Sequence, residues 1–152
     1  NRYSDYGKGI GNGIPVGAFA MTEKSGTGIV KPGDHGATYG GNPLACMAVK
    51  TVIDIFEEEK IVEHVNEVSE YLTERLEELV QHVDGVLERK GTGLMQGIVL
   101  KKPAAQVNNR AIEEGLLVIQ AQGNVLRLVP PLIIEKEHVD EMIPKLTKAL
   151  TE

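Results

Sequence analysis

The feature that most constrains the fold is a helical repeat of apolar residues in the middle of the chain. Between residues 60 and 82, apolar side chains step by three or four positions, with Glu, Arg and Gln on the opposite side. The repeat consists of Ile61, Val65, Val68, Leu72, Leu76, Leu79 and Val83. It predicts a long amphipathic helix that lies on the surface of a domain.

After this helix the sequence changes to short apolar runs separated by glycine-rich turns. Strands are predicted at 86–90, 94–100, 116–119 and 125–129. Helices are predicted at about 103–114 and 135–150, the last of which should bury Val139, Met142, Ile143, Leu146 and Leu150. Residues 85–152 therefore predict a compact α+β unit.

The first third of the chain is rich in glycine and is predicted to be mainly turns and loops. A short strand is expected within 14–21. A helix is expected over 42–58, with Asn42 as its N-cap and Pro43 as its first residue. Its wide apolar face predicts that this helix is largely buried, and Cys46 should lie on the buried face.

Composition excludes several classes of partner. The 152 residues carry a net charge of −6, and the chain has no Trp and only 4% aromatic residues, so neither nucleic acid nor an anionic membrane surface is an expected partner. No apolar run approaches the roughly 20 residues of a membrane span. The single cysteine cannot form an internal disulfide and suits a reducing compartment, so a cytoplasmic location is expected.

The histidines and the acidic run offer no site by spacing. His35, His64, His82 and His138 lack the spacing of metal ligands, so no metal is expected. The last three are predicted to lie in solvent on or beside polar helix faces, and the acidic run 57–59 is predicted to be a solvated helix end.

A lysine stands among glycines near the start of the chain, in the segment 7–17 (Gly-Lys-Gly-Ile-Gly-Asn-Gly-Ile-Pro-Val-Gly). Its spacing fits neither a P-loop nor a dinucleotide-binding motif. Lys8 in such a turn has room for a flat group beside it and can act as an amine nucleophile toward a carbonyl. The alternative is a solvated surface lysine.

A second segment, 35–46, combines two glycines, a hydroxyl, a phenol and a helix start. Such a helix start can bind a phosphate or a carboxylate. The alternative is an ordinary capped loop. His35 and Tyr39 could contact a ligand or simply pack the loop.

These two segments, followed by Gly91–Gly97 and Asn124–Leu132, resemble the class III aminotransferases in residue type and in order. This family belongs to the fold-type I enzymes that depend on pyridoxal phosphate (PLP). The resemblance covers nearly the whole chain, and four ordered motifs make it specific.

The resemblance implies a role for three residues. Lys8 matches the lysine that binds PLP covalently, is displaced by substrate and then moves a proton at the substrate α-carbon. Thr38 matches the hydroxyl that binds the cofactor phosphate of the neighbouring subunit, which implies a homodimer with shared active sites. Arg127 matches the arginine that binds the substrate α-carboxylate; from the residues alone it could equally be an exposed arginine at a strand end.

The resemblance also implies a division of the chain. Residues 1–58 match a remnant of the large PLP-binding domain, 59–84 a linking amphipathic helix and 85–152 the small α+β domain. The fold class expected is α/β, as the C-terminal part of a PLP-dependent transferase. Residues 1–7 are not expected to form the strand that carries the lysine, and Asp5 does not match the family's aspartate that pairs with the pyridine nitrogen.

The function implied for the complete protein is transamination between N-acetylornithine and 2-oxoglutarate, in arginine biosynthesis. Ornithine, 4-aminobutyrate and succinyl-diaminopimelate remain alternative amino donors. The chain by itself is expected to be an inactive fragment. The alternative from a different class is a non-catalytic folding or dimerisation module.

Overall fold

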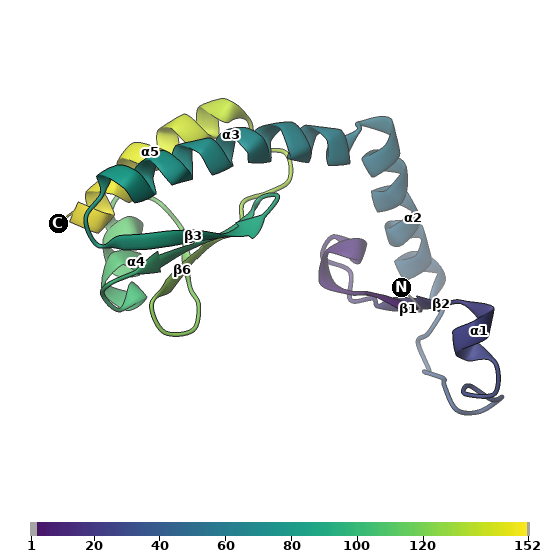
Figure 1. Cartoon of the computed structure of the whole chain (residues 1–152). Helices are drawn as coiled ribbons and strands as arrows, with labels where there is room; N and C mark the ends of the chain where they lie inside the picture. The colour runs from purple at the N-terminus through teal and green to yellow at the C-terminus, as the bar shows by residue number, and fades with distance from the viewer. Residues whose placement is uncertain (1–2, 152) are drawn as a thin grey trace. The chain divides into compact units, whose positions relative to one another are not determined.

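The computed structural model describes the backbone of residues 3–151 and the side chains of residue 7 and of residues 9–151. The chain divides into two compact units, Asn1–Lys60 and Ile61–Glu152 (Figure 1). Each unit is described below on its own.

The second unit is built on an antiparallel sheet of four strands. Its strands are β3 (Val86–Thr92), β4 (Met95–Leu100), β5 (Ile119–Gln120) and β6 (Val125–Leu128), in the spatial order β3-β4-β6-β5. The strands predicted at 86–90, 94–100 and 125–129 are confirmed. The strand predicted at 116–119 is confirmed only at its end, since β5 begins at Ile119; the amide of Leu116 turns back to donate to the carbonyl of Ala111 at 2.7 Å, so residues 116–118 form no strand.

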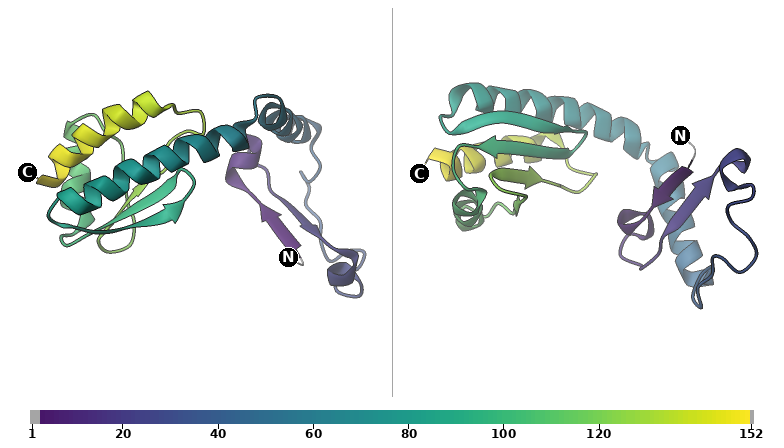
Figure 2. Two further views of the ribbon diagram at one scale, coloured as in Figure 1. Left: turned by 45° about the horizontal axis from the view of Figure 1, so that its top comes forward. Right: turned by 60° about the horizontal axis from the view of Figure 1, so that its bottom comes forward.

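Three helices cover one face of this sheet. They are α3 (Ile61–His82), α4 (Ala104–Glu113) and α5 (Lys136–Thr151), which confirms the three helices predicted for this part of the chain. Figures 1 and 2 show α3 and α5 side by side along the sheet. The largest fully buried apolar side chains lie between the helices and the sheet: Leu72, Leu76, Ile98, Leu100, Leu126, Val139 and Leu146. Met142, Ile143 and Leu150 are only partly buried at the edge of this core.

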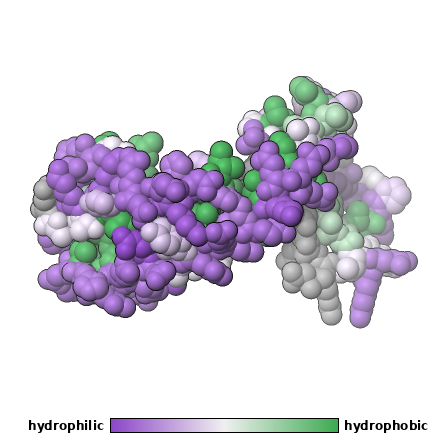
Figure 3. Space-filling view, turned by 90° about the horizontal axis from the view of Figure 1, so that it is seen from above, coloured by the Kyte–Doolittle hydropathy of each residue, from purple (hydrophilic) through white to green (hydrophobic). Residues whose placement is uncertain are grey.

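The outward surface of α3 and α5 is mainly hydrophilic, as the view from above shows (Figure 3). Ion pairs and hydrogen bonds tie the two helices together there. Nζ of Lys136 donates to Oε1 of Glu67 at 2.6 Å, and the hydroxyl of Tyr71 donates to Asp140 at 2.5 Å. The Lys136 ammonium lowers the pKa of Glu67, and Glu67 in turn raises the pKa of Lys136. The hydrogen bond to Asp140 raises the pKa of the Tyr71 hydroxyl.

The prediction that His64 is solvated is wrong. His64 is partly buried, and its Nε2 lies 2.9 Å from the carbonyl oxygen of Ile134, in the segment that leads into α5. This contact joins two segments that are far apart in the sequence. The pattern of polar and apolar residues along a single helix does not predict such a contact. His82 and His138 are exposed, as predicted, and so is the acidic run 57–59.

The first unit contains an antiparallel pair of strands, β1 (Tyr3–Tyr6) and β2 (Ala18–Met21), a 3-10 turn η1 (Lys8–Gly11), and the helices α1 (Glu23–Gly26) and α2 (Pro43–Glu58). The strand predicted within 14–21 is confirmed as β2. The expectation that residues 1–7 form no strand is wrong: β1 pairs with β2 over its whole length and ends two residues before Lys8. Pairing with β2 supplies the backbone partners of this short segment.

Helix α2 begins as predicted, since Oδ1 of Asn42 accepts hydrogen bonds from the amides of Leu44 at 3.0 Å and Ala45 at 3.2 Å. Its predicted burial is wrong, because α2 has no buried residue. The apolar side chains that are partly covered share one stripe: Ala45, Ala48, Val49 and Val52. Cys46 does not belong to this stripe. Its side chain is exposed, which corrects its predicted place on a buried face.

Candidate functional site

Arg127 lies on the face of the sheet that the helices of its unit do not cover. Its neighbours on β6, Leu126 and Leu128, point into the core and are 0% and 4% exposed. Because side chains alternate along a strand, the guanidinium of Arg127 points to the opposite face, where it is exposed. It makes no hydrogen bond or ion pair with any side chain or backbone group that the structure describes. The guanidinium is therefore an available cation, and its planar arrangement of N–H donors matches the two oxygens of a carboxylate.

The guanidinium lies in a shallow groove of about 470 Å³ on that face. Gly97 of β4 pairs directly with Arg127, and Lys90 of β3 pairs with Gly97 from the other side. All three residues line the groove. Gly97 contributes no side chain, so the space between the two cations stays open; a Cβ added there would come within 3.3 Å of Val125 Cγ1.

Sequence analysis did not single out Lys90. The signal that could have found it is the turn of the β3–β4 hairpin. Thr92 pairs with Met95, so Gly93 and Leu94 form a two-residue loop, and Gly93 has a φ of +57°. Counting outward from that loop places Lys90 opposite Gly97.

A buried amide beneath the groove fixes this hairpin. Gln96 is 1% exposed and points to the helix side of the sheet. Its Nε2 donates to the carbonyl of Gly93 at 2.6 Å, and its Oε1 accepts from Nη1 of Arg89 at 2.9 Å. Nε of Arg89 in turn donates to Glu77 of α3 at 2.7 Å. The strand that carries Lys90 is thereby anchored to α3.

Lys8 is the first residue of η1, directly after the short connection from β1. The side chain of Lys8 lies outside the described residues. On either side of it, Gly7 and Gly9 have open space where a Cβ would be. Gly9 also lines a cavity of about 690 Å³ between η1, β2 and α2, whose walls include Phe19 and Val52. The surroundings of this lysine therefore leave room for a flat group.

Thr38 lies in a turn that the hydrogen bond from Gly40 N to Ala37 O closes at 3.1 Å. Its side chain is exposed, and its hydroxyl has no partner among the residues that the structure describes. The first amides of α2, by contrast, already donate to Asn42. An anion near this loop would thus meet the hydroxyl of Thr38 rather than the start of α2.

The two other candidate residues of the segment 35–46, His35 and Tyr39, differ in their surroundings. The ring of His35 packs edge-on against Phe19 of β2, with the ring centroids 4.9 Å apart. The ring of Tyr39 is 83% exposed. His35 therefore packs the loop against β2, and the phenol of Tyr39 is accessible.

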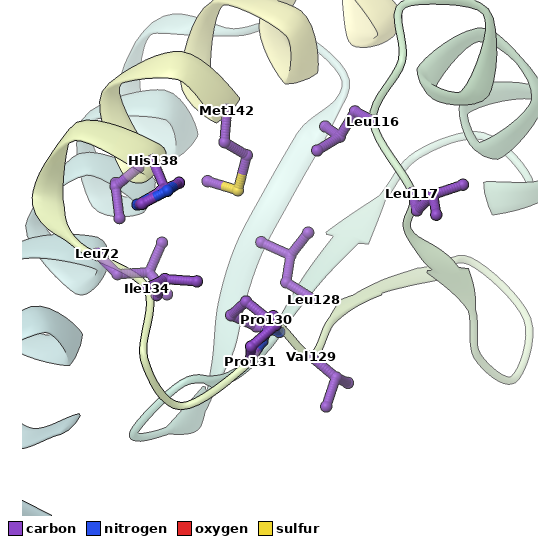
Figure 4. Close-up of a pocket in the computed structure, with 11 residues that line it drawn as sticks. Leu72, Leu116, Leu117, Leu128, Val129, Pro130, Pro131, Ile134, His138 and Met142 are labelled. Atoms are coloured by element: carbon purple, nitrogen blue, oxygen red, sulfur yellow. The ribbon is translucent and has the colours of Figure 1, made fainter. Parts of the chain in front are cut away.

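A third cavity, of about 370 Å³, lies between α5, β6 and the segment after α4. Figure 4 shows Met142, Leu116 and Leu128 pointing toward its centre and Leu117 pointing away. Of the described residues that line it, His138 is the only titratable one, and Nδ1 of His138 accepts a hydrogen bond from the Glu135 amide at 3.0 Å. The cavity extends the apolar core and offers no group for catalysis beyond this ring.

Lys8 and Thr38 thus belong to the first unit and Arg127 to the second. Within the residues whose side chains the structure describes, His, Cys, Asp and Glu form no cluster that could hold a metal ion. The same residues contain no helix with the length and apolar character that crossing a membrane requires.

A family profile described as "Aminotransferase class-III" matches residues 5–150. An acetylornithine aminotransferase from Aquifex aeolicus is 45% identical over 143 residues, which are 94% of this chain and 36% of that protein.

Solved structures give the same result for the fold. Plasmodium falciparum ornithine delta-aminotransferase superimposes with a TM-score of 0.90 at 29% identity, covering 98% of this chain and 39% of the other. An amine transaminase from an uncultivated Pseudomonas species, in a PLP-bound form, gives a TM-score of 0.87 at 30% identity, covering 98% and 38%. The predicted fold class, part of a PLP-dependent transferase, is confirmed. The chain spans little more than a third of the length of these relatives.

Proposed function

The chain belongs to the class-III aminotransferases, and from that membership we propose that the complete protein transfers an amino group from N-acetylornithine to 2-oxoglutarate, with PLP as cofactor. The observation that carries the proposal is the match of residues 5–150 to the family profile, which includes Lys8, Thr38 and Arg127. The 45% identity to a protein named for acetylornithine favours this donor over ornithine, 4-aminobutyrate and succinyl-diaminopimelate. Arginine biosynthesis in the cytoplasm is part of the same proposal.

The surroundings of Lys8 fit PLP, because the glycines beside it leave open space and the cavity next to Gly9 has apolar walls. When bound, PLP supplies an aldehyde for amines and an electron sink for the reacting carbon. Nζ of Lys8 would hold the cofactor, and its free amine would be the base that takes the proton from the carbon bearing the amino group.

The hydroxyl of Thr38 donates a hydrogen bond to the cofactor phosphate in this scheme. Its exposure and lack of a partner among the described residues support a contact with a group outside its own unit. We assign the phosphate to a second subunit, so that the active protein is a homodimer with shared sites. A chain that holds half of each site is expected to have little or no activity alone.

Arg127 binds the α-carboxylate of the substrate. Two parallel hydrogen bonds from its guanidinium fix both the position and the plane of that carboxylate. The groove beside Gly97 gives the ligand access, and the anchored β3–β4 hairpin keeps the floor of the groove rigid. The division into a large-domain remnant at 1–58, a linking helix at 59–84 and a small domain at 85–152 belongs to the same proposal.

A non-catalytic folding or dimerisation module is the second candidate. The observation in its favour is that the second unit has its own apolar core, from Val68 on α3 to Ala149 on α5. A unit with its own core can fold and associate without binding a cofactor.

Binding of PLP to the 152-residue chain separates the two candidates. We expect the chain to bind PLP with a saturable absorbance change, and Lys8→Ala to abolish that change. Lys24→Ala, a change at an exposed lysine of the same unit, serves as the matched control and should bind like the parent. Equal PLP binding by the parent chain and Lys8→Ala would contradict the proposal and favour the module.

A further inference from the structure

Two histidines bind the opposite ends of one peptide group in the second unit. The carbonyl of Ile134 and the amide of Glu135 belong to that peptide. Nε2 of His64, on α3, lies 2.9 Å from the carbonyl oxygen, and Nδ1 of His138, on α5, accepts from the amide at 3.0 Å. The peptide lies in the segment 129–135, which connects β6 to α5. The proposed function uses neither histidine.

The two histidines respond differently to a proton. A carbonyl oxygen only accepts, so Nε2 of His64 donates, and it can donate from the neutral ring and from the protonated ring. Nδ1 of His138 accepts, so the ring of His138 must be neutral, with its proton on Nε2. Protonation of His138 therefore removes its hydrogen bond with the amide of Glu135, while the hydrogen bond of His64 persists.

His138 occupies the place of the acceptor in a capping box. Helix α5 begins at Lys136, so Glu135 is its N-cap and His138 is its third residue. In a capping box the side chain at this third position accepts a hydrogen bond from the N-cap amide, as the imidazole does here. A positive charge in the first turn also opposes the helix dipole. The ring therefore caps the helix in its neutral form.

The same ring forms part of the wall of the apolar cavity of about 370 Å³. The other described residues that line this cavity are apolar. Figure 4 shows His138 on the side of the cavity where Ile134 and Met142 lie. A charged imidazolium against an apolar wall loses part of its hydration, and His138 is already exposed to water. A protonated ring should therefore turn away from the cavity into solvent.

The charged groups around His138 lie outside the lining of the cavity. Lys145 pairs with Glu141 at 2.6 Å and lowers the pKa of this carboxylate, and the charge of His138 acts in the same direction. Carboxylates and lysines ordinarily keep their charge between about pH 5 and 8, whereas histidine changes its charge there. The groups concerned are Glu135, Lys136, Glu137 and Glu141 on or next to α5, and His64 and Glu67 on α3.

We propose that His138 is a proton-controlled latch, whose neutral ring holds the segment 129–135 on the start of α5 and closes the apolar cavity. Protonation of the ring releases the segment and opens the cavity to solvent. The latch acts between about pH 5 and 8, the range in which histidine changes its charge. His64 keeps its hydrogen bond with the same peptide, so the opening is local and the second unit stays folded.

The test follows the amide of Glu135 and the methyl group of Met142 by NMR, in the 152-residue chain at pH 7.5 and 5.5. Exchange of the amide with water, corrected for its intrinsic rate, gives the protection of this amide. Loss of one helix cap corresponds to about fivefold lower protection at pH 5.5. Relaxation of the Met142 methyl group by a soluble paramagnetic agent should rise over the same change in pH. Protection of the Leu146 amide, deep in α5, should stay constant.

His138→Gln keeps an acceptor at the third helix position and does not titrate, so both signals should become independent of pH. His64→Gln keeps a donor for the carbonyl of Ile134, and His82→Gln changes an exposed histidine at the end of α3. Both of these control variants should retain the pH dependence of the parent chain.

Three results overturn the inference. The first is protection of the Glu135 amide that is equal at the two pH values in the parent chain. The second is a pH dependence that survives His138→Gln or disappears in His64→Gln. The third is a parallel loss of protection at Leu146, because it would report a general loosening of α5 instead of a latch.

Discussion

The amide of Gln96 is fully buried and bridges Arg89 and the carbonyl of Gly93, which places a polar network under the hairpin that carries Lys90. Gln96→Leu removes the acceptor of Arg89 Nη1 and the donor to the carbonyl of Gly93, while Nε of Arg89 keeps its hydrogen bond to Glu77. We expect a loss of about 1–3 kcal/mol in the free energy of unfolding. Urea unfolding followed by circular dichroism measures it.

Gln106→Leu is the control for this change, because Gln106 is an exposed glutamine on α4. Its effect should stay within about 0.5 kcal/mol. Equal effects of the two substitutions would contradict the structural role of Gln96.

The core of the second unit predicts that substitutions of two leucines have different effects on the free energy of unfolding. Leu126 is 0% exposed and Leu117 is 86% exposed. Leu126→Ala should destabilise the unit by about 2–5 kcal/mol, because it leaves a cavity between the sheet and the helices. Leu117→Ala should change the unfolding free energy by less than about 0.5 kcal/mol. Thermal and urea unfolding of both variants test the burial directly.

The cap of α2 makes a local prediction. Asn42→Ala removes the acceptor for the amides of Leu44 and Ala45. The free energy that stabilises the first turn of α2 should then fall by about 1 kcal/mol. Hydrogen exchange at these two amides should accelerate, while exchange near the middle of α2 changes less. Asn42→Asp keeps an acceptor and should preserve the slow exchange; acceleration in that variant as well would argue against the cap.

The pair of Glu67 and Lys136 predicts a pH dependence. The pKa of Glu67 is lowered from 4.5 on folding, so the stability it contributes is present above 4.5 and is lost as the pH falls through the folded value. The pKa of Lys136 is raised from 10.5, so its contribution is present below 10.5 and is lost as the pH rises through the folded value.

Glu67→Gln should therefore reduce stability at neutral pH and flatten the acid side of the stability profile. Urea unfolding between pH 3 and 8 checks this, with the exposed Glu70→Gln on the same helix as control. An unchanged acid limb in Glu67→Gln would contradict the contribution of the pair.

Local sequence patterns predicted well those helices whose positions depend mainly on neighbouring residues in the sequence. The apolar repeat predicted α3, and the Asn-Pro start predicted the first residue of α2. Of the run 116–119 only Ile119 belongs to a strand, because the hydrogen bond from the amide of Leu116 to the carbonyl of Ala111 closes the end of α4 there. A periodic pattern says which side chains share a face, but it does not say what covers that face; this is why the burial of α2 and of Cys46 was mispredicted.

The sequence predicted only part of the candidate site. Arg127 was found through the family resemblance, and its exposure follows from strand alternation between Leu126 and Leu128. Lys90 required the register of the β3–β4 hairpin, which depends on pairing between distant residues and not on either strand alone. The roles of Lys8 and Thr38 come from the resemblance and stay predictions.

Covalent mapping of PLP on the 152-residue chain tests the central claim most directly. The chain is incubated with stoichiometric PLP, reduced with borohydride and digested, and the modified lysines are identified by mass spectrometry. The proposed function predicts one modified peptide, with the label on Lys8 and close to one label per chain. Labelling scattered over the exposed lysines, with no preference for Lys8, would contradict it.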